Sequence, residues 1–262
     1  MSEGLIDEAG VEEKTPEETR PPWFRLRAVL VHLYTASGVV LALLILVAAF
    51  QNEAVTALWL MLASLIIDST DGLLARRFRV SEALPFFDGA MLDNIVDYMT
   101  YVFAPMILLW SGGYLPLGNT GVVLAALPLL ASSYQFCRVD AKTDDHFFLG
   151  FPSYFNVFAF YAIVFDPKPS LLAIVLVVCS LLVFVPVRYV YPTRTVAFRK
   201  LSLTLTALWL VSYALILLEM PEPDPLILGF SIFYLFYYFG LSLYLSGKML
   251  EARRLEQETE AS

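Results

Sequence analysis

The chain has 262 residues, of which 58% are hydrophobic and only 16% are charged, and its mean hydropathy is +0.68. A soluble domain of this size would carry about 25% charged residues, so the composition excludes a soluble globular protein and indicates an integral membrane protein. Much of the acid behind the net charge of −8 lies near the two chain ends, where it is typical of solvated tails. Nothing in the sequence suggests nucleic-acid binding.

The apolar segments predict an all-α, polytopic membrane helix bundle. A helix needs about 20 mainly apolar residues to cross the hydrocarbon core. We expect an acidic, disordered N-terminal arm over 1–22, one membrane domain over 23–248, and a charged cytoplasmic tail over 249–262. The membrane domain should contain about eight transmembrane helices, at roughly 29–50, 54–75, 90–111, 118–137, 150–166, 169–188, 200–219 and 225–247.

The positive charges predict the orientation of these spans. Lys and Arg are enriched in the cytoplasmic loops of membrane proteins, and with eight spans the two chain ends share one side. That side carries sixteen of the seventeen Lys and Arg residues, whereas the opposite loops hold only Lys168. We therefore predict that both termini are cytoplasmic.

Two pairs of aspartates interrupt the second and third apolar segments. Asp68 and Asp71 are three residues apart, and Asp93 and Asp97 are four apart, so each pair shares one face of a helix. Carboxylates inside a membrane are costly and usually mark a functional site in the bundle interior. Four of them close together need a counter-charge, and hard oxygen ligands suit Mg²⁺ or Mn²⁺. The pattern predicts a metal site, with two ions able to clamp a diphosphate.

Around these aspartates the sequence resembles the signature of the CDP-alcohol phosphotransferases, membrane enzymes that displace CMP from a CDP-activated substrate with an alcohol. The matching text is Asp68-x-x-Asp71-Gly72-x-x-Ala75-Arg76, followed by Gly89-x-x-x-Asp93-x-x-x-Asp97. Twelve residues separate Arg76 from Gly89, which is longer than the usual family spacing. That longer gap resembles the bacterial phosphatidylcholine synthase branch, as do the eight spans and the segments LPFFDGAMLDNIVDYMTYVFAP, FPSYFNVFAFY and RYVYPTRT.

The resemblance implies a reaction and a set of roles. CDP-diacylglycerol and choline would give phosphatidylcholine and CMP, at an active site facing the cytoplasm in the inner membrane of a bacterium, and the enzyme would be a homodimer. Asp68, Asp71, Asp93 and Asp97 would ligate the metal, and Asp97 would also act as general base on the choline hydroxyl. Four signature residues would line the CDP site: Gly72, Ala75, Arg76 and Gly89.

The acceptor pocket is less well defined by the sequence. Choline carries a fixed positive charge, and an aromatic cage is the physical expectation for its recognition. Candidate substrate residues are the aromatics and arginines of the predicted cytoplasmic side, which are Tyr98, Tyr154, Tyr189, Tyr191, Arg138, Arg188 and Arg194. Asp88, just before Gly89, is expected to cap the N-terminus of the third span.

Two other functions fit parts of the sequence. One is an enzyme of the same family that uses serine, inositol or glycerol phosphate as acceptor, although the aromatic-rich surroundings favour choline. The other is a cation transporter that uses the aspartate cluster. Transporters often contain internal repeats, and no acidic pair between residues 118 and 248 matches the first one.

Overall fold

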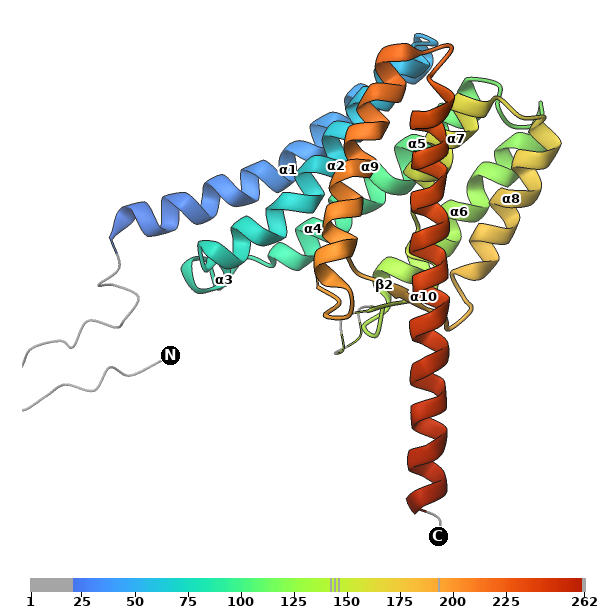
Figure 1. Ribbon diagram of the computed structural model, residues 1–262. Coiled ribbons are helices and arrows are strands. Elements are labelled where there is room, and N and C mark those ends of the chain that lie inside the picture. Colours follow the sequence, from blue (N-terminus) through green and yellow to red (C-terminus); the bar gives the residue numbers. More distant parts are fainter. Residues whose placement is uncertain (1–20, 142, 144, 146, 193, 261–262) are drawn as a thin grey trace, which may run out of the picture.

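The computed structural model describes residues 21–141, 143, 145, 147–192 and 194–260. Nearly all of the predicted arm, up to residue 20, lies outside the described residues. The all-α prediction is confirmed (Figure 1). The helical segments are α1 (Pro22–Phe50), α2 (Ala54–Arg77), α3 (Val80–Ala83), α4 (Gly89–Asp97), η1 (Tyr98–Phe103), α5 (Ala104–Ser111), α6 (Asn119–Cys137), α7 (Phe155–Phe165), α8 (Pro169–Leu182), α9 (Arg199–Glu219) and α10 (Pro225–Glu260).

Within the described residues, six helical segments are long and apolar enough to cross a membrane. Five of them are the single helices α1, α2, α6, α9 and α10. The sixth is the continuous segment Gly89–Ser111, which consists of α4, η1 and α5. α7 and α8 have 11 and 14 residues and are apolar but shorter. Each predicted span therefore corresponds to a helix, while the count of eight crossings and the orientation remain predictions. α10 continues without a break past residue 248 and projects beyond the other helices (Figure 1).

The predicted limits of the fifth and sixth spans, 150–166 and 169–188, were wrong at residue 150 and at residue 188. Gly150 has a φ of +86°, and a Cβ added there would lie 2.2 Å from the carbonyl oxygen of Val183. Only glycine fits that turn, so α7 begins later. α8 ends before Pro186, because the residue preceding a proline disfavours the helical conformation.

The segments just before α7 and just after α8 pair as a two-stranded antiparallel sheet that the sequence did not predict. β1 (Phe147–Leu149) pairs with β2 (Arg188–Val190), with Phe148 opposite Tyr189. β2 then docks on α10. The backbone amides of Arg188 and Val190 donate to the hydroxyls of Ser246 and Ser242, and the Tyr238 hydroxyl donates to the Val190 carbonyl.

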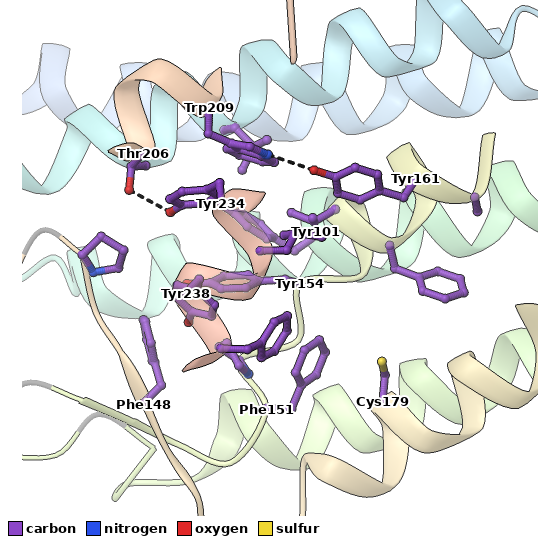
Figure 2. Close-up of a pocket in the computed structure, with 18 of the residues that line it drawn as sticks. Tyr101, Phe148, Phe151, Tyr154, Tyr161, Cys179, Thr206, Trp209, Tyr234 and Tyr238 are labelled. Atoms are coloured by element: carbon purple, nitrogen blue, oxygen red, sulfur yellow. Dashed lines mark hydrogen bonds between the residues drawn. The ribbon is translucent and has the colours of Figure 1, made fainter. Parts of the chain in front are cut away.

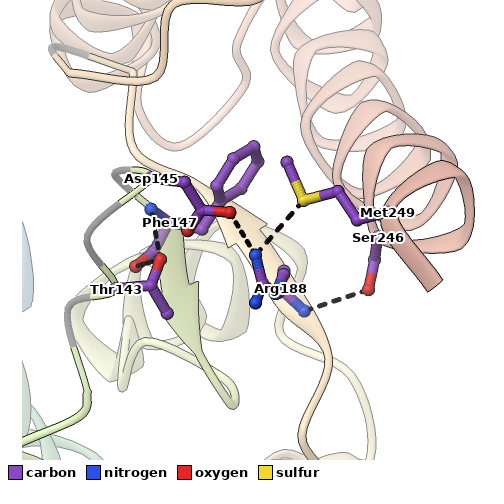
Figure 3. A network of polar contacts seen from close by, with 6 residues as sticks. All are labelled: Thr143, Asp145, Phe147, Arg188, Ser246 and Met249. Carbon is purple, nitrogen blue, oxygen red and sulfur yellow. Dashed lines mark hydrogen bonds and ion pairs between the residues drawn. The ribbon is translucent and has the colours of Figure 1, made fainter. Parts of the chain in front are cut away.

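Side-chain contacts also stabilise this two-stranded sheet (Figure 3). The Arg188 guanidinium pairs with Asp145 and contacts the sulfur of Met249 at 3.3 Å. The hydroxyl of Thr143 accepts from the amide of Phe147 at 3.0 Å. Burial alone would raise the pKa of the Asp145 carboxyl, but hydrogen bonds from Thr143 and the charge of Arg188 outweigh burial and leave that pKa below its ordinary value.

The loop that lengthens the signature has its own small core. Residues 78–88 include α3, whose Val80 and Ala83 are buried together with Ala28 and Val31 of α1. The extra residues between Arg76 and Gly89 therefore pack the first turns of α1 and the last turns of α2 together, next to the start of α4.

The third span contains a π-helical segment, η1, between α4 and α5. Pro105 follows in the first turn of α5 and has no N–H to donate to the carbonyl four residues earlier, which belongs to Tyr101. π-helical turns interrupt α-helices in this way and are frequent at functional sites.

Candidate active site

Three aspartates of the signature lie close together in space, two from its first half and one from its second half. Asp68 and Asp71 on α2 and Asp93 on α4 each offer a carboxylate oxygen, and these three oxygens lie within 4.8 Å of one another. Asp71 is 5% exposed, while Asp68 and Asp93 are half-buried. The i, i+3 spacing on α2 makes this possible, because it directs both side chains toward α4.

The donor set fits a divalent cation. All three ligand atoms are carboxylate oxygens, which are the ligands that Mg²⁺ and Mn²⁺ prefer. A buried carboxylate such as Asp71, with two others close by, needs a positive charge nearby to remain ionised. Asp97 is not one of the three clustered residues, but it lines the same cavity as Asp68 and Asp93.

A tyrosine that the sequence analysis did not place at the metal site holds one of these aspartates. The hydroxyl of Tyr101 in η1 donates to Oδ2 of Asp68 at 2.6 Å. Tyr101 is 5% exposed, and such hydrogen bonds to metal-binding side chains orient them.

The glycines of the signature have different neighbours. At Gly72 an added Cβ would meet only Nη1 of Arg76, at 3.3 Å, so the guanidinium lies over a face of α2 that is otherwise open. At Gly89 an added Cβ would lie 2.7 Å from Cε1 of His32. The small size of Gly89 thus accommodates the His32 ring on α1, a role that the sequence analysis missed. Ala75 packs against the small core beneath α1.

A single cavity of about 560 Å³ begins at the carboxylates. Asp68, Asp93 and Asp97 form one end, and the rest of its wall is almost entirely aromatic and aliphatic, from α7, α8, α9 and α10 (Figure 2). The volume lies within the range of about 300–1,000 Å³ that is usual for small-molecule sites. The half-buried carboxylates therefore lie at one end of a cavity whose remaining wall is mainly apolar.

Five aromatic rings gather where the cavity approaches the carboxylates, and we call them the aromatic cluster: Tyr101, Phe148, Tyr154, Tyr191 and Tyr238. Tyr154 is at its centre. Its ring centroid lies 6.0 Å from those of Tyr101 and Tyr238 and 6.5 Å from that of Phe148. Phe148 stacks on Tyr191 at 4.5 Å.

The structure separates the predicted substrate residues into two groups. Tyr154 and Tyr191 line the cavity, and the Arg194 guanidinium lies 5.6 Å from the Tyr191 ring. The Tyr98 hydroxyl instead donates to the Leu129 carbonyl of α6, and Tyr189 is buried against Phe151 and Phe239.

The other two predicted arginines are engaged elsewhere. Arg138 forms a bidentate pair with Asp140, which lowers the pKa of that carboxyl. Arg188 pairs with Asp145 beside the two-stranded sheet (Figure 3).

The predicted N-cap is confirmed. Oδ1 of Asp88 accepts a hydrogen bond from the amide of Met91 at 2.9 Å, which fixes the start of α4 and therefore the position of Asp93. Tyr238, by contrast, had no distinguishing signal in the sequence. It is one of 34 Phe and Tyr residues, and only the docking of β2 on α10 explains its place in the aromatic cluster.

Comparison with known proteins places this site in a family. The sequence model of the CDP-alcohol phosphatidyltransferase family matches residues 29–185, which include all the aspartates described above. A phosphatidylcholine synthase of Legionella bozemanae is 42% identical, with 76% of this chain and 94% of the relative covered. Phosphatidylcholine synthases of Legionella pneumophila and Pseudomonas aeruginosa are 40% and 38% identical, over 83% and 87% of this chain and 88% and 95% of theirs. The chain is a membrane-embedded member of the CDP-alcohol phosphatidyltransferase family.

Proposed function

We propose that this chain is a metal-dependent phosphatidyltransferase that condenses CDP-diacylglycerol with choline to give phosphatidylcholine and CMP. One observation carries the proposal. A three-carboxylate group and an aromatic cluster open into the same cavity, so a diphosphate and a quaternary ammonium can be bound side by side. The names of the relatives agree with this substrate pair.

The roles of the residues follow from their positions. Asp68, Asp71 and Asp93 would hold Mg²⁺ or Mn²⁺, in two sites if Asp97 also contributes. When bound, the divalent ions would neutralise the negative charge of the diphosphate and of the transferring phosphoryl group. The Arg76 guanidinium over Gly72 can bind a phosphate oxygen with its fork of donors, and the open face of Gly72 leaves room for the nucleotide.

Asp97 is suited to act as general base. The choline hydroxyl oxygen attacks the phosphorus that carries the diacylglycerol, its proton passes to the Asp97 carboxylate, and the bond to the CMP phosphate breaks. A general base must lie within reach of the proton that it removes. Asp97 is one helical turn from Asp93 and lines the same cavity as the aromatic cluster.

The aromatic cluster favours choline over the other alcohols. The trimethylammonium group cannot donate hydrogen bonds, and ring faces attract it by cation–π interaction, worth about 0.5–2 kcal/mol for each well-placed ring. Inositol, serine and glycerol phosphate all need hydrogen-bond partners, and glycerol phosphate also needs a positive charge. The wall around Tyr154 offers few such groups.

A direct assay tests the reaction. Purified protein with CDP-diacylglycerol, labelled choline and Mn²⁺ should give labelled lipid and an equal amount of CMP, and EDTA should abolish both. Lipid formed with serine, inositol or glycerol phosphate but not with choline would disprove the acceptor and keep the reaction class. Cation flux through proteoliposomes, with no lipid formed from any alcohol, would instead support a transporter.

We further propose that the site faces the cytoplasm from the inner membrane of a bacterium, and that the enzyme is a homodimer. The strong bias of Lys and Arg to one side supports the orientation. A single cysteine introduced at Ser81 should react with an impermeant maleimide only after the inner membrane is opened. One introduced at Asn119 should react in spheroplasts. The reverse pattern would contradict the orientation, and cross-linking of purified protein tests the dimer.

A further inference from the structure

Beyond the aromatic cluster the cavity continues as an apolar arm between α7, α8 and α10. We define the apolar arm by the side chains that line it farthest from the carboxylates, which are Phe158, Phe165, Leu171, Val175, Cys179 and Leu235. Neither the diphosphate nor choline needs this space. The proposed function therefore leaves a substantial part of the cavity without an occupant.

The polar groups in the wall of the arm are satisfied by one another (Figure 2). The Tyr161 hydroxyl pairs with Oγ of Ser231 at 2.6 Å and accepts from the Trp209 indole at 3.1 Å. The Tyr234 and Thr206 hydroxyls pair at 2.8 Å. Because these polar groups pair with one another, the arm suits an apolar occupant, and a polar group brought there would lose its hydrogen bonds to water.

The length of the arm matches one leaflet of a bilayer. Lining residues on α7 run from Val157 to Phe165, a rise of about 12 Å at 1.5 Å per residue. Half of the hydrocarbon core is about 15 Å thick. An extended hydrocarbon chain with its head at the carboxylates would thus lie along α7 for most of one leaflet.

The arm also borders the lipid-facing surface. Val175 on α8 is 39% exposed and Phe239 on α10 is 36% exposed, and both line the cavity. In a membrane the solvent at these side chains is lipid. α8 and α10 thus form the two sides of an opening through which a hydrocarbon chain can pass sideways from the bilayer.

We propose that one acyl chain of the CDP-activated lipid occupies the apolar arm and enters it between α8 and α10. The inference rests on the proposed function, because the continuity of the arm with the carboxylates identifies the chain as part of the lipid substrate. The second acyl chain remains in the bilayer. The arm binds the donor in a fixed orientation, with its diphosphate at Asp68, Asp71 and Asp93.

The test compares two donor lipids, dioleoyl and dihexanoyl CDP-diacylglycerol. Each is measured with one variant in the arm and with a control variant at the adjacent residue. Cys179→Trp fills the arm, and Val178→Trp adds the same bulk at a residue that is 48% exposed and turned about 100° away on α8. For Cys179→Trp we expect kcat/KM to fall about tenfold or more with the dioleoyl donor, the scale of an overpacked site. The dihexanoyl donor should lose much less, and Val178→Trp should resemble the parent enzyme with both.

A labelling experiment covers the case in which Cys179→Trp does not fold. In a Cys137→Ser background, a membrane-permeant maleimide should modify Cys179, and dioleoyl CDP-diacylglycerol with Mn²⁺ should slow the reaction where the dihexanoyl lipid does not. Equal protection by both lipids, or by neither, would overturn the apolar-arm proposal while leaving the transferase intact. A parent enzyme inactive with every donor would instead disprove the proposed function.

Discussion

The Tyr101 hydroxyl donates a 2.6 Å hydrogen bond to the Asp68 carboxylate, across the contact between η1 and α2. Tyr101 also contributes a ring to the aromatic cluster, 6.0 Å from that of Tyr154. One side chain thus contacts both the proposed metal site and the proposed ammonium site, so its hydroxyl and its ring can be tested separately.

Tyr101→Phe removes the hydroxyl and keeps the ring. Loss of a hydrogen bond that orients a metal ligand typically costs about 10–100-fold in metal affinity or activity. We therefore expect the Mn²⁺ concentration for half-maximal activity to rise by about that factor, with activity recovering at high Mn²⁺ and little change in the KM for choline. Tyr134→Phe on the outer face of α6 is the control. An unchanged Mn²⁺ titration would show that Tyr101 does not orient Asp68.

Asp97→Asn should remove turnover while leaving the donor site in place. General-base catalysis typically contributes about 10²–10⁴-fold, and we expect a loss of that size in kcat. Mn²⁺-dependent binding of CDP-diacylglycerol should persist, because Asp68, Asp71 and Asp93 remain. Asp88→Asn is the matched control, since asparagine caps a helix about as well as aspartate. A fully active Asp97→Asn enzyme would rule out Asp97 as the base.

Tyr154→Phe and Tyr154→Leu distinguish the ring from the hydroxyl at the centre of the aromatic cluster. A cation–π contact of about 0.5–2 kcal/mol corresponds to roughly a 2- to 30-fold change in affinity. The leucine variant should raise the KM for choline by that factor, and the phenylalanine variant should not. Measuring the KM for CDP-diacylglycerol in parallel checks that the donor site is intact. Equal effects of the two substitutions would argue against cation–π recognition here.

Asp145→Asn tests how much the ion pair between Asp145 and Arg188 contributes to the stability of the fold. The Asp145 pKa is lowered in the folded protein, so the paired carboxylate stabilises the fold above its unfolded pKa of about 3.9 and this contribution is lost as pH falls through the lowered value. A partly exposed pair is worth about 0–1 kcal/mol.

The expected result is a melting temperature slightly below that of the parent protein at pH 7. The difference should shrink as the pH falls below about 4 and vanish once the pH is below the lowered pKa of the folded protein. Thermal unfolding in detergent at a series of pH values measures it. A difference that persists at low pH would mean that the substitution acts through packing and not through charge.

The sequence alone was enough to predict the parts of the site that depend on spacing along one helix. The shared face of Asp68 and Asp71, the cap at Asp88 and the helical class follow from local patterns, whereas the meeting of Asp93 with the first pair was expected from the order of the spans and from the family signature. The pairing of β1 with β2 joins residues roughly forty positions apart, and the docking of β2 on α10 through Ser242 and Ser246 joins residues more than fifty positions apart. No local periodicity encodes such contacts, which is why Tyr238 was not predicted to line the cavity.

Gly89 illustrates a different limit. Its place in the signature suggested close approach of a nucleotide, whereas the nearest group to its missing side chain is the ring of His32. A glycine in a sequence indicates that something comes near the backbone, but it does not say what. The neighbour is set by the packing of α1 on the loop before α4.

The π-helical turn of η1 fixes how the third span faces its surroundings. One extra residue in a turn rotates everything after it by about 100°. The polar face of α4, with Asp93 and Asp97, can therefore point into the cavity, while the residues of α5 from Ala104 to Leu109 are turned into the apolar core. Deleting one residue of η1 would align the two halves and force them to share one direction. The two halves of this span therefore face different directions: α4 presents carboxylates to the cavity, and α5 packs in the apolar core.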